Sequence, residues 1–144
     1  EGARLAAVIL ERLALIEVAV ERIATRAPER VIAQRDRLVE NIAKLTNGLA
    51  LDEQRVAQEI AILADRLDAG EEIDRFRVHI AAFAGALRDG GDEPVGKRLG
   101  FLLQEMLREA NTAGSKANDA LIQRDVIAIK EELERIREQV ENIE

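Results

Sequence analysis

Apolar residues in the first 50 positions recur at steps of three and four residues, which places them on one face of a helix. The first stripe comprises Leu5, Val8, Ile9, Leu13, Ile16, Val20 and Ile23. Pro28 disfavours the α conformation at the residue before it and suits a first turn, so we expect one helix to end at Ala27 and another to begin. A second stripe covers residues 31–49, and Asn47-Gly48 signals its stop. This pattern predicts an antiparallel hairpin arm over residues 1–50, with an exposed apolar face that needs a partner.

Three further helices are predicted between residues 51 and 120. The first of them begins with Asp52 as its cap and weakens at Ala69-Gly70. The next carries an apolar stripe from Ile73 to Leu87 and ends in residues 88–94, where two glycines, a proline and three acids predict a loop. The helix that follows starts at Val95 and is expected to fade around residues 113–115.

The last helix has the most regular pattern. Its apolar residues alternate steps of four and three, a heptad seam that demands a facing helix: Ile122, Val126, Ile129, Leu133, Ile136, Val140 and Ile143. The sequence shows no strand-like alternation. The predicted fold is therefore all-α, with about six helices and no sheet, and the hairpin arm is followed by a C-terminal helical domain, a bundle, over residues 51–144.

Composition narrows the possible partners. The chain is 47% hydrophobic but only 2% aromatic, so its core is built from Ala, Leu, Ile and Val. Its formal charge of -7 repels phosphate unless basic groups are segregated or a metal intervenes. The absence of Cys excludes disulfides and thiolate metal sites, and no apolar run approaches the roughly 20 residues of a membrane span, which favours a cytoplasmic protein. Because the helical pattern starts at once after Glu1-Gly2, without an initiator Met, we expect a piece of a longer protein.

Two helices carry residues with candidate chemistry. Glu72, Arg75 and His79 fall at i, i+3 and i+7 and share one side of their helix, while Glu105 and Glu109 lie one turn apart on another. Two carboxylates at this spacing can hold Mg²⁺ or Mn²⁺, and a nearby imidazole can transfer a proton. The cations that could bind the phosphate of such a site are Arg98, Arg108 and Lys116.

The same spacings have an ordinary structural interpretation. Glutamates and arginines one turn apart commonly form ion pairs on solvated helices, which is the more frequent outcome of this pattern, and a lone His on a polar face is more often a hydrogen-bonding group than a catalyst. Residues 111–119 could present amides and an ammonium group to a phosphate, or could form a turn in which Asn118 or Asp119 caps the last helix.

Other chemistries fail for lack of residues. With one His, one Ser and no Cys, a nucleophilic triad would need Ser115 and His79 with an acid, and a zinc site would have a single imidazole. The sequence has no Gly-rich phosphate loop, no pair of aromatic residues that could stack bases, and no signal specific to DNA binding. Sequence-specific readout of RNA by this chain is therefore not expected.

Several ordered sequence blocks resemble the C-terminal part of the bacterial YicC/YloC family of endoribonucleases. They are LDEQRVAQE at 51–59, EEIDR at 71–75 with His79, PVGKRL at 94–99, FLLQEM at 101–106, REANT at 108–112, GSK at 114–116 and IREQVENIE at 136–144. The resemblance is strong over residues 51–144 and looser over the predicted arm. The chain departs from the family pattern at Gly100, Leu107 and Ala117, where the family usually has Asp, usually has Asn and often has Ser.

The resemblance implies a cytoplasmic, divalent-metal-dependent endoribonuclease that assembles as a ring-like homo-oligomer, a hexamer, and encloses RNA, with a further N-terminal domain. It places acid–base or metal functions at Glu72, His79, Glu105 and Glu109, and phosphate contacts at Arg75, Arg98, Arg108 and Lys116. We expect the present chain alone to have little or no nuclease activity. The alternative is a non-catalytic helical scaffold whose apolar seams join subunits and whose charged stripes are ion pairs.

Overall fold

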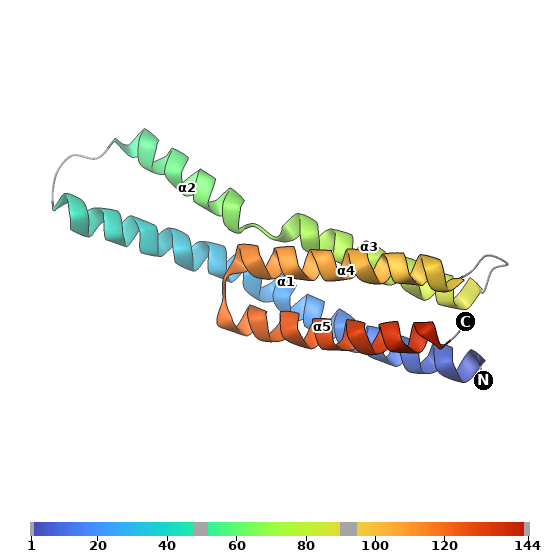
Figure 1. Cartoon of the computed structure of the whole chain (residues 1–144). Coiled ribbons are helices and arrows are strands. Elements are labelled where there is room, and N and C mark those ends of the chain that lie inside the picture. Colours follow the sequence, from blue (N-terminus) through green and yellow to red (C-terminus); the bar gives the residue numbers. More distant parts are fainter. Residues whose placement is uncertain (1, 48–51, 90–94, 143–144) are drawn as a thin grey trace.

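A computed structural model describes residues 2–47, 52–89 and 95–142 of the chain. These residues form five helices, and no strand occurs among them (Figure 1). The helices are α1 (Gly2–Thr46), α2 (Glu53–Leu67), α3 (Gly70–Asp89), α4 (Val95–Ala117) and α5 (Ala120–Glu141). The all-α prediction is confirmed, whereas the expectation of about six helices is wrong for the described residues.

The correction falls on α1, which is one helix of 45 residues where a two-helix hairpin over residues 1–50 was predicted. Pro28 lies inside this helix. Its ring keeps φ in the helical range, but proline lacks the N–H that would bond the carbonyl of Ala24, so one hydrogen bond is lost without ending the helix. The two halves of α1 pack on different partners (Figure 1), and this packing keeps the helix continuous through the proline.

The first half of α1 forms a four-helix bundle with α3, α4 and α5 (Figure 1). In the bundle α1 contacts α5 and α3, α3 contacts α4, and α4 contacts α5, so each helix has two main neighbours. Consecutive bundle helices run antiparallel, which brings both chain ends to the same end of the molecule. The largest fully buried side chains come from all four helices: Ile9, Ile16, Phe83, Leu99, Met106, Ile122, Ile129 and Ile136.

The predicted heptad seam of the last helix is confirmed within the described residues. All its positions from Ile122 to Val140 are at most 5% exposed, and the facing helices are α1 and α4 of the same chain. Ion pairs flank the contact with α1, including Arg12 with Glu132 at 2.9 Å. The apolar seam of α5 is therefore covered by α1 and α4 of the same chain.

The connection between α4 and α5 differs from the prediction. Helix α4 continues through residues 113–115, where it was expected to fade, and ends at Ala117. Gly114 is buried, and a Cβ atom there would lie 3.0 Å from Val126 Cγ2. This glycine thus allows close approach of α5 instead of stopping α4. The left-handed turn falls on Asn118 (φ 44°), and Asp119 caps α5, as one predicted alternative had it.

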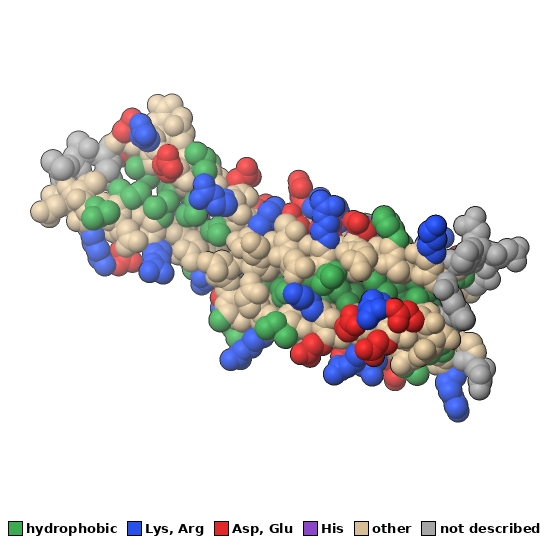
Figure 2. Space-filling view, in the orientation of Figure 1, with side chains coloured by type: hydrophobic (Ala, Val, Ile, Leu, Met, Phe, Trp, Pro, Cys, Tyr) green, Lys and Arg blue, Asp and Glu red, His purple; other side chains and the backbone are tan. Residues whose placement is uncertain are grey.

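The second half of α1 (residues 28–46) and α2 form a two-helix extension beyond the bundle (Figure 1). Asp52 caps α2 as predicted, because its side chain accepts hydrogen bonds from the amides of Gln54 and Arg55. None of the residues of α2 is buried, and Ile32 and Ile62 remain about half exposed at 51% each. Figure 2 shows hydrophobic side chains at the surface of this extension. Over its described positions, residues 31–47, the predicted apolar stripe is therefore only partly covered.

Positions 90–94 of the predicted loop and positions 48–51 lie outside the described residues. Within the part of the chain that is described, no helix combines the length and the apolar run needed to cross a membrane.

Replacing Pro28 by Ala is expected to stabilise the chain by about 2 kcal/mol, because the restored N–H can bond within the helix and the gain exceeds the entropy that proline removes from the unfolded chain. Urea denaturation of both forms measures this difference. An unchanged or lower free energy of unfolding would contradict the interpretation of Pro28 as a local defect in α1.

The acid stability of the chain is expected to depend on Asp119. Hydrogen bonds from Arg26 lower the pKa of this carboxyl from 3.8 to about 2, and the Ile122 amide and Arg30 act in the same direction. Because the folded-state pKa is lowered, the stabilisation is complete above pH 3.8 and is lost as the pH falls toward about 2. Asp119→Asn, which can still cap α5, should cost on the order of 2 kcal/mol at neutral pH.

The measurement is urea denaturation of both forms across this pH range. The difference between wild type and Asp119→Asn should shrink at acid pH, and a difference that does not change with pH would contradict the ion-pair explanation. Asp36→Asn, at an α1 position whose side chain is 65% exposed, is the matched control.

Candidate functional site

The contact between α3 and α4 brings together most of the predicted site residues. On α3 the spacing i, i+3 and i+7 directs three of them toward α4, and on α4 the spacing i, i+4 and i+11 directs three others toward α3. Ion pairs and close approach of side chains link all six across the helix pair: Glu72, Arg75, His79, Glu105, Glu109 and Lys116. The sequence placed these residues on faces, and the structure shows that the two faces meet.

Two of these carboxylates are buried. Glu72 is 3% exposed and Glu109 is 5% exposed, which is unusual for glutamate unless counter-ions are present. Arg75 Nε donates to Glu109 Oε1 at 3.1 Å, and Lys116 Nζ donates to Glu72 Oε1 at 2.6 Å. Arg75 Nη2 also approaches Glu72 Oε1, at 3.5 Å. The α3–α4 contact therefore contains a charged network that alternates acid and base.

These contacts stabilise the charged forms of Arg75 and Lys116. The hydrogen bond to Glu109 raises the pKa of Arg75, and the hydrogen bond to Glu72 raises the pKa of Lys116. The second carboxylate oxygen of Glu72 is buried and has no hydrogen-bond partner among the described residues. Glu72 and Glu109 both line a small cavity with apolar walls that include Phe76 and Ile129. A buried polar atom without a partner costs free energy, so Glu72 is held by its other oxygen alone.

His79, Glu105 and Glu109 form a cluster that could bind a metal ion. One potential ligand atom from each lies within 4.8 Å of the other two, and His79 and Glu105 are half-buried. Opposite ligands of one small divalent ion lie about 4.4 Å apart, twice a typical bond length, so small side-chain rotations would suffice. One imidazole nitrogen and two carboxylates suit Mn²⁺ better than Mg²⁺, which prefers oxygen ligands alone. The residues present fit a divalent cation.

The remaining predicted site residues are not joined to this network. Arg98 and Arg108 on α4 are exposed and form no ion pair with any residue that the structure describes. Glu71, which the sequence analysis did not select, accepts from Arg75 Nη1 at 3.5 Å. Its i, i+4 spacing to Arg75 was a signal that could have identified it.

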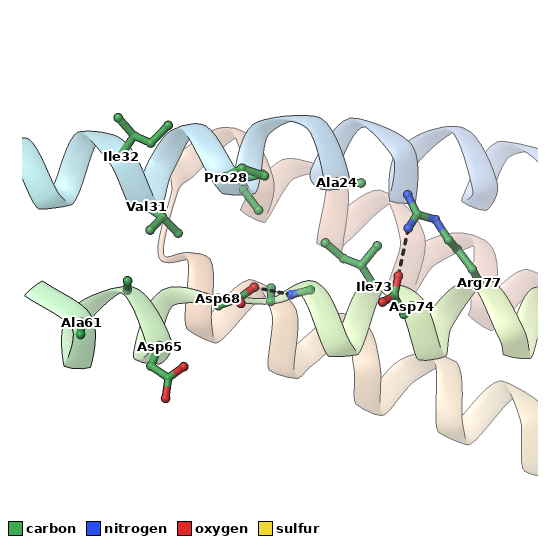
Figure 3. Close-up of a pocket in the computed structure, with 14 residues that line it drawn as sticks. Ala24, Pro28, Val31, Ile32, Ala61, Asp65, Asp68, Ile73, Asp74 and Arg77 are labelled. Carbon is green, nitrogen blue, oxygen red and sulfur yellow. Dashed lines mark hydrogen bonds and ion pairs between the residues drawn. The ribbon is translucent and has the colours of Figure 1, made fainter.

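A larger pocket lies elsewhere, where the α1–α2 extension meets the bundle (Figure 3). Small apolar side chains and Ile73 form much of its lining, and Asp65, Asp68, Asp74 and Arg77 add charge. Figure 3 shows that Pro28 lies on one side of this pocket and Asp68 on the other. None of the predicted site residues lines it. Its size alone therefore does not connect it with the candidate chemistry.

The departures from the resembled pattern have different structural settings. A Cβ atom on Gly100 would meet nothing within 4 Å, so space does not require a glycine there. Leu107, in contrast, packs against the hydrophobic core, and Ala117 is only 3% exposed. A side chain can therefore start at position 100 without a clash at Cβ, whereas a polar residue at 107 would replace an apolar contact.

Residues 23–144 match the sequence model of the family described as "Endoribonuclease YicC-like, C-terminal". Two curated relatives are both named "Probable endoribonuclease YicC". The one from Haemophilus influenzae (strain ATCC 51907 / DSM 11121 / KW20 / Rd) is 38% identical over 144 residues, and the one from Clostridioides difficile (strain 630) is 41% identical over 145 residues. Each alignment covers 100% of this chain and 49% of the relative, so the chain spans about half the length of these relatives.

Removing the ammonium group of Lys116 tests whether the buried network stabilises the helix pair. Lys116→Met should cost about 1–2 kcal/mol, because Glu72 would keep only its longer contact to Arg75. Urea denaturation measures the loss. Lys130→Met, at an exposed position of α5, is the control. If both substitutions change the free energy of unfolding by the same small amount, the ion pair between Lys116 and Glu72 does not contribute to stability.

Proposed function

Because the chain belongs to the family of YicC-like endoribonucleases, whose C-terminal part it matches, we propose that it supplies part of a divalent-metal-dependent active site that cleaves RNA phosphodiester bonds. The observation that carries this proposal is the cluster of His79, Glu105 and Glu109, whose ligand atoms lie within 4.8 Å of one another. The cluster combines the single histidine of the chain with two carboxylates, which are donor types that a divalent cation takes.

The residues of this cluster have distinct proposed roles. Glu105 and Glu109 would hold the cation, Mn²⁺ or Mg²⁺. The imidazole of His79 would either be a third ligand or carry a proton beside the two carboxylates. When bound, a divalent cation supplies charge for the phosphate oxygens and lowers the pKa of a coordinated water. Helix α4 carries both carboxylates one turn apart, and burial in the α3–α4 contact restricts Glu109 before substrate arrives.

Basic residues divide into two groups. Arg98 and Arg108 are exposed on α4 and are the side chains we propose for phosphate contacts. Arg75 and Lys116 were predicted to bind phosphate as well, but their charges are engaged by Glu109 and Glu72. Glu72 is buried and contacts two cations, Arg75 and Lys116. We therefore propose that Glu72 positions these two side chains and does not transfer a proton in the reaction.

We further propose that the active enzyme needs more than this chain. Its charge of -7 disfavours RNA binding, and the curated relatives are about twice as long. The missing RNA contacts would come from another part of a longer protein or from other subunits of a cytoplasmic homo-oligomer, with a hexamer as the state implied by resemblance. The chain alone should then have little or no nuclease activity, and tight, salt-sensitive RNA binding by it would contradict this.

A second candidate function is a helical scaffold without chemistry of its own. The alternation of Glu72, Arg75, Glu109 and Lys116 supports it, because such a network can simply hold α3 against α4. Exposed apolar residues on the outer sides of α1 and α5, such as Leu15, Val18 and Ile127, could join subunits. Concentration-dependent association without Mn²⁺ binding would favour this candidate.

Two substitutions test the catalytic proposal. Glu105→Gln should weaken Mn²⁺ binding to the chain by more than about tenfold, because it replaces a charged carboxylate ligand with a neutral amide. His79→Ala should weaken it to a similar extent if the imidazole is the third ligand. In a protein of the relatives' full length, both should abolish most cleavage of structured RNA while the helical content persists. Isothermal titration calorimetry, circular dichroism and a cleavage assay provide the measurements.

Glu131→Gln, which removes an exposed carboxylate of α5, is the matched control and should leave both readouts unchanged. Wild-type Mn²⁺ affinity in both Glu105→Gln and His79→Ala would refute the metal site. Unchanged cleavage in both would refute the assignment of these residues to the reaction.

A further inference from the structure

Arg75 occupies the centre of the charged network and contacts three carboxylates. Its Nε donates to Glu109 at 3.1 Å, its Nη1 to Glu71 at 3.5 Å and its Nη2 to Glu72 at 3.5 Å. The side chain is 50% exposed, so one part of the guanidinium group faces the interior and another faces solvent. Such a group is held in place by several weak contacts.

The anchor for Arg75 is Glu72, whose side chain is 4% exposed. Lys116 fixes the same Glu72 oxygen at 2.6 Å, and the apolar walls of the small cavity, including Val20 and Ile23 of α1, surround the buried glutamates. Glu72 therefore cannot follow Arg75 into solvent. Its side chain therefore stays beside the guanidinium group regardless of what happens at Glu109.

Glu109 belongs to two groups at once. It is the strongest partner of Arg75 by distance, and it is one of the three residues of the candidate metal cluster. A guanidinium charge on this carboxylate neutralises part of the field that would attract a divalent cation, and a cation at the cluster would repel Arg75. The two positive charges therefore compete electrostatically for one buried carboxylate.

We propose that Arg75 is the internal counter-ion of the His79–Glu105–Glu109 cluster: it neutralises Glu109 when no cation is bound and thereby sets a low affinity for divalent metal. This inference rests on the proposed metal site and adds a regulator of that site. It assigns Arg75 a role different from a phosphate contact. The opposite role, in which Arg75 merely orients Glu109 as a ligand, predicts the opposite change in affinity when the charge is removed.

The test is a titration of Mn²⁺ into the chain by isothermal titration calorimetry, with variants that separate charge from shape. Arg75→Gln removes the charge and should bind Mn²⁺ roughly tenfold more tightly, a moderate gain because solvent screens a half-exposed group. Arg75→Lys keeps the charge and should remain within about threefold of wild type. The control Arg77→Gln removes a charge from the same helix, where Arg77 pairs with Glu21 and Asp74, and should leave the affinity unchanged.

Each outcome distinguishes the inference from the function on which it rests. Weaker or unchanged binding by Arg75→Gln, or equally tightened binding by Arg75→Lys, would overturn the counter-ion role while leaving the metal site in place. If neither wild type nor Arg75→Gln binds Mn²⁺, both the metal site and this inference are overturned. Thermal unfolding with and without Mn²⁺ gives a second readout, since a tighter ligand raises Tm more. If Arg75→Gln folds only when Mn²⁺ is added, the inference is supported, and if Mn²⁺ fails to restore folding, it is refuted.

Discussion

Burial of negative charge between α3 and α4 is the constraint on which the candidate site depends. Two glutamates lie inside a helix contact that would otherwise be apolar, and a buried carboxylate is stable only with counter-ions close by. Arg75 and Lys116 supply them from opposite helices, so the electrostatic requirement also fixes how α3 and α4 face each other. The half-buried cluster beside them inherits this order, because Glu109 is common to the ion pair and the cluster.

Much of the fold could be predicted from the spacing of apolar residues, because burial on one face leaves a periodic pattern. The seam of α5 followed this way. The cap at Asp52 followed from the preference of helix N-termini for Asp, and Asp119 was one of two candidates for the cap of α5. Pro28 and Gly114 were misread for related reasons. Both are local stop signals, but tertiary packing overrides them: α1 continues through the proline, and Gly114 is small because Val126 lies close. A local pattern does not reveal which partner helix compensates such a defect.

The site was predictable as two faces but not as one geometry. Spacing placed Glu72, Arg75 and His79 on one side of their helix, and Glu105 and Glu109 on one side of another. The periodicity of a helix is enough to assign residues to a face in this way. The pairing of Arg75 with Glu109 joins residues 34 positions apart and depends on how the helices pack. For the same reason the sequence could not separate Arg75 and Lys116, which are engaged by carboxylates, from Arg98 and Arg108, which are exposed.

The pairing of the first helix with the last has a consequence for synthesis on the ribosome. Arg12 of α1 meets Glu132 of α5, 120 residues further along the chain. At about 5–20 residues per second, that separation leaves the apolar stripe of α1 without its main partner for roughly 6–24 s. During this interval the nascent chain presents a long amphipathic surface to its surroundings. Its tolerance of slow translation should therefore depend on chaperones that shield such a surface, more than on the final stability of the bundle.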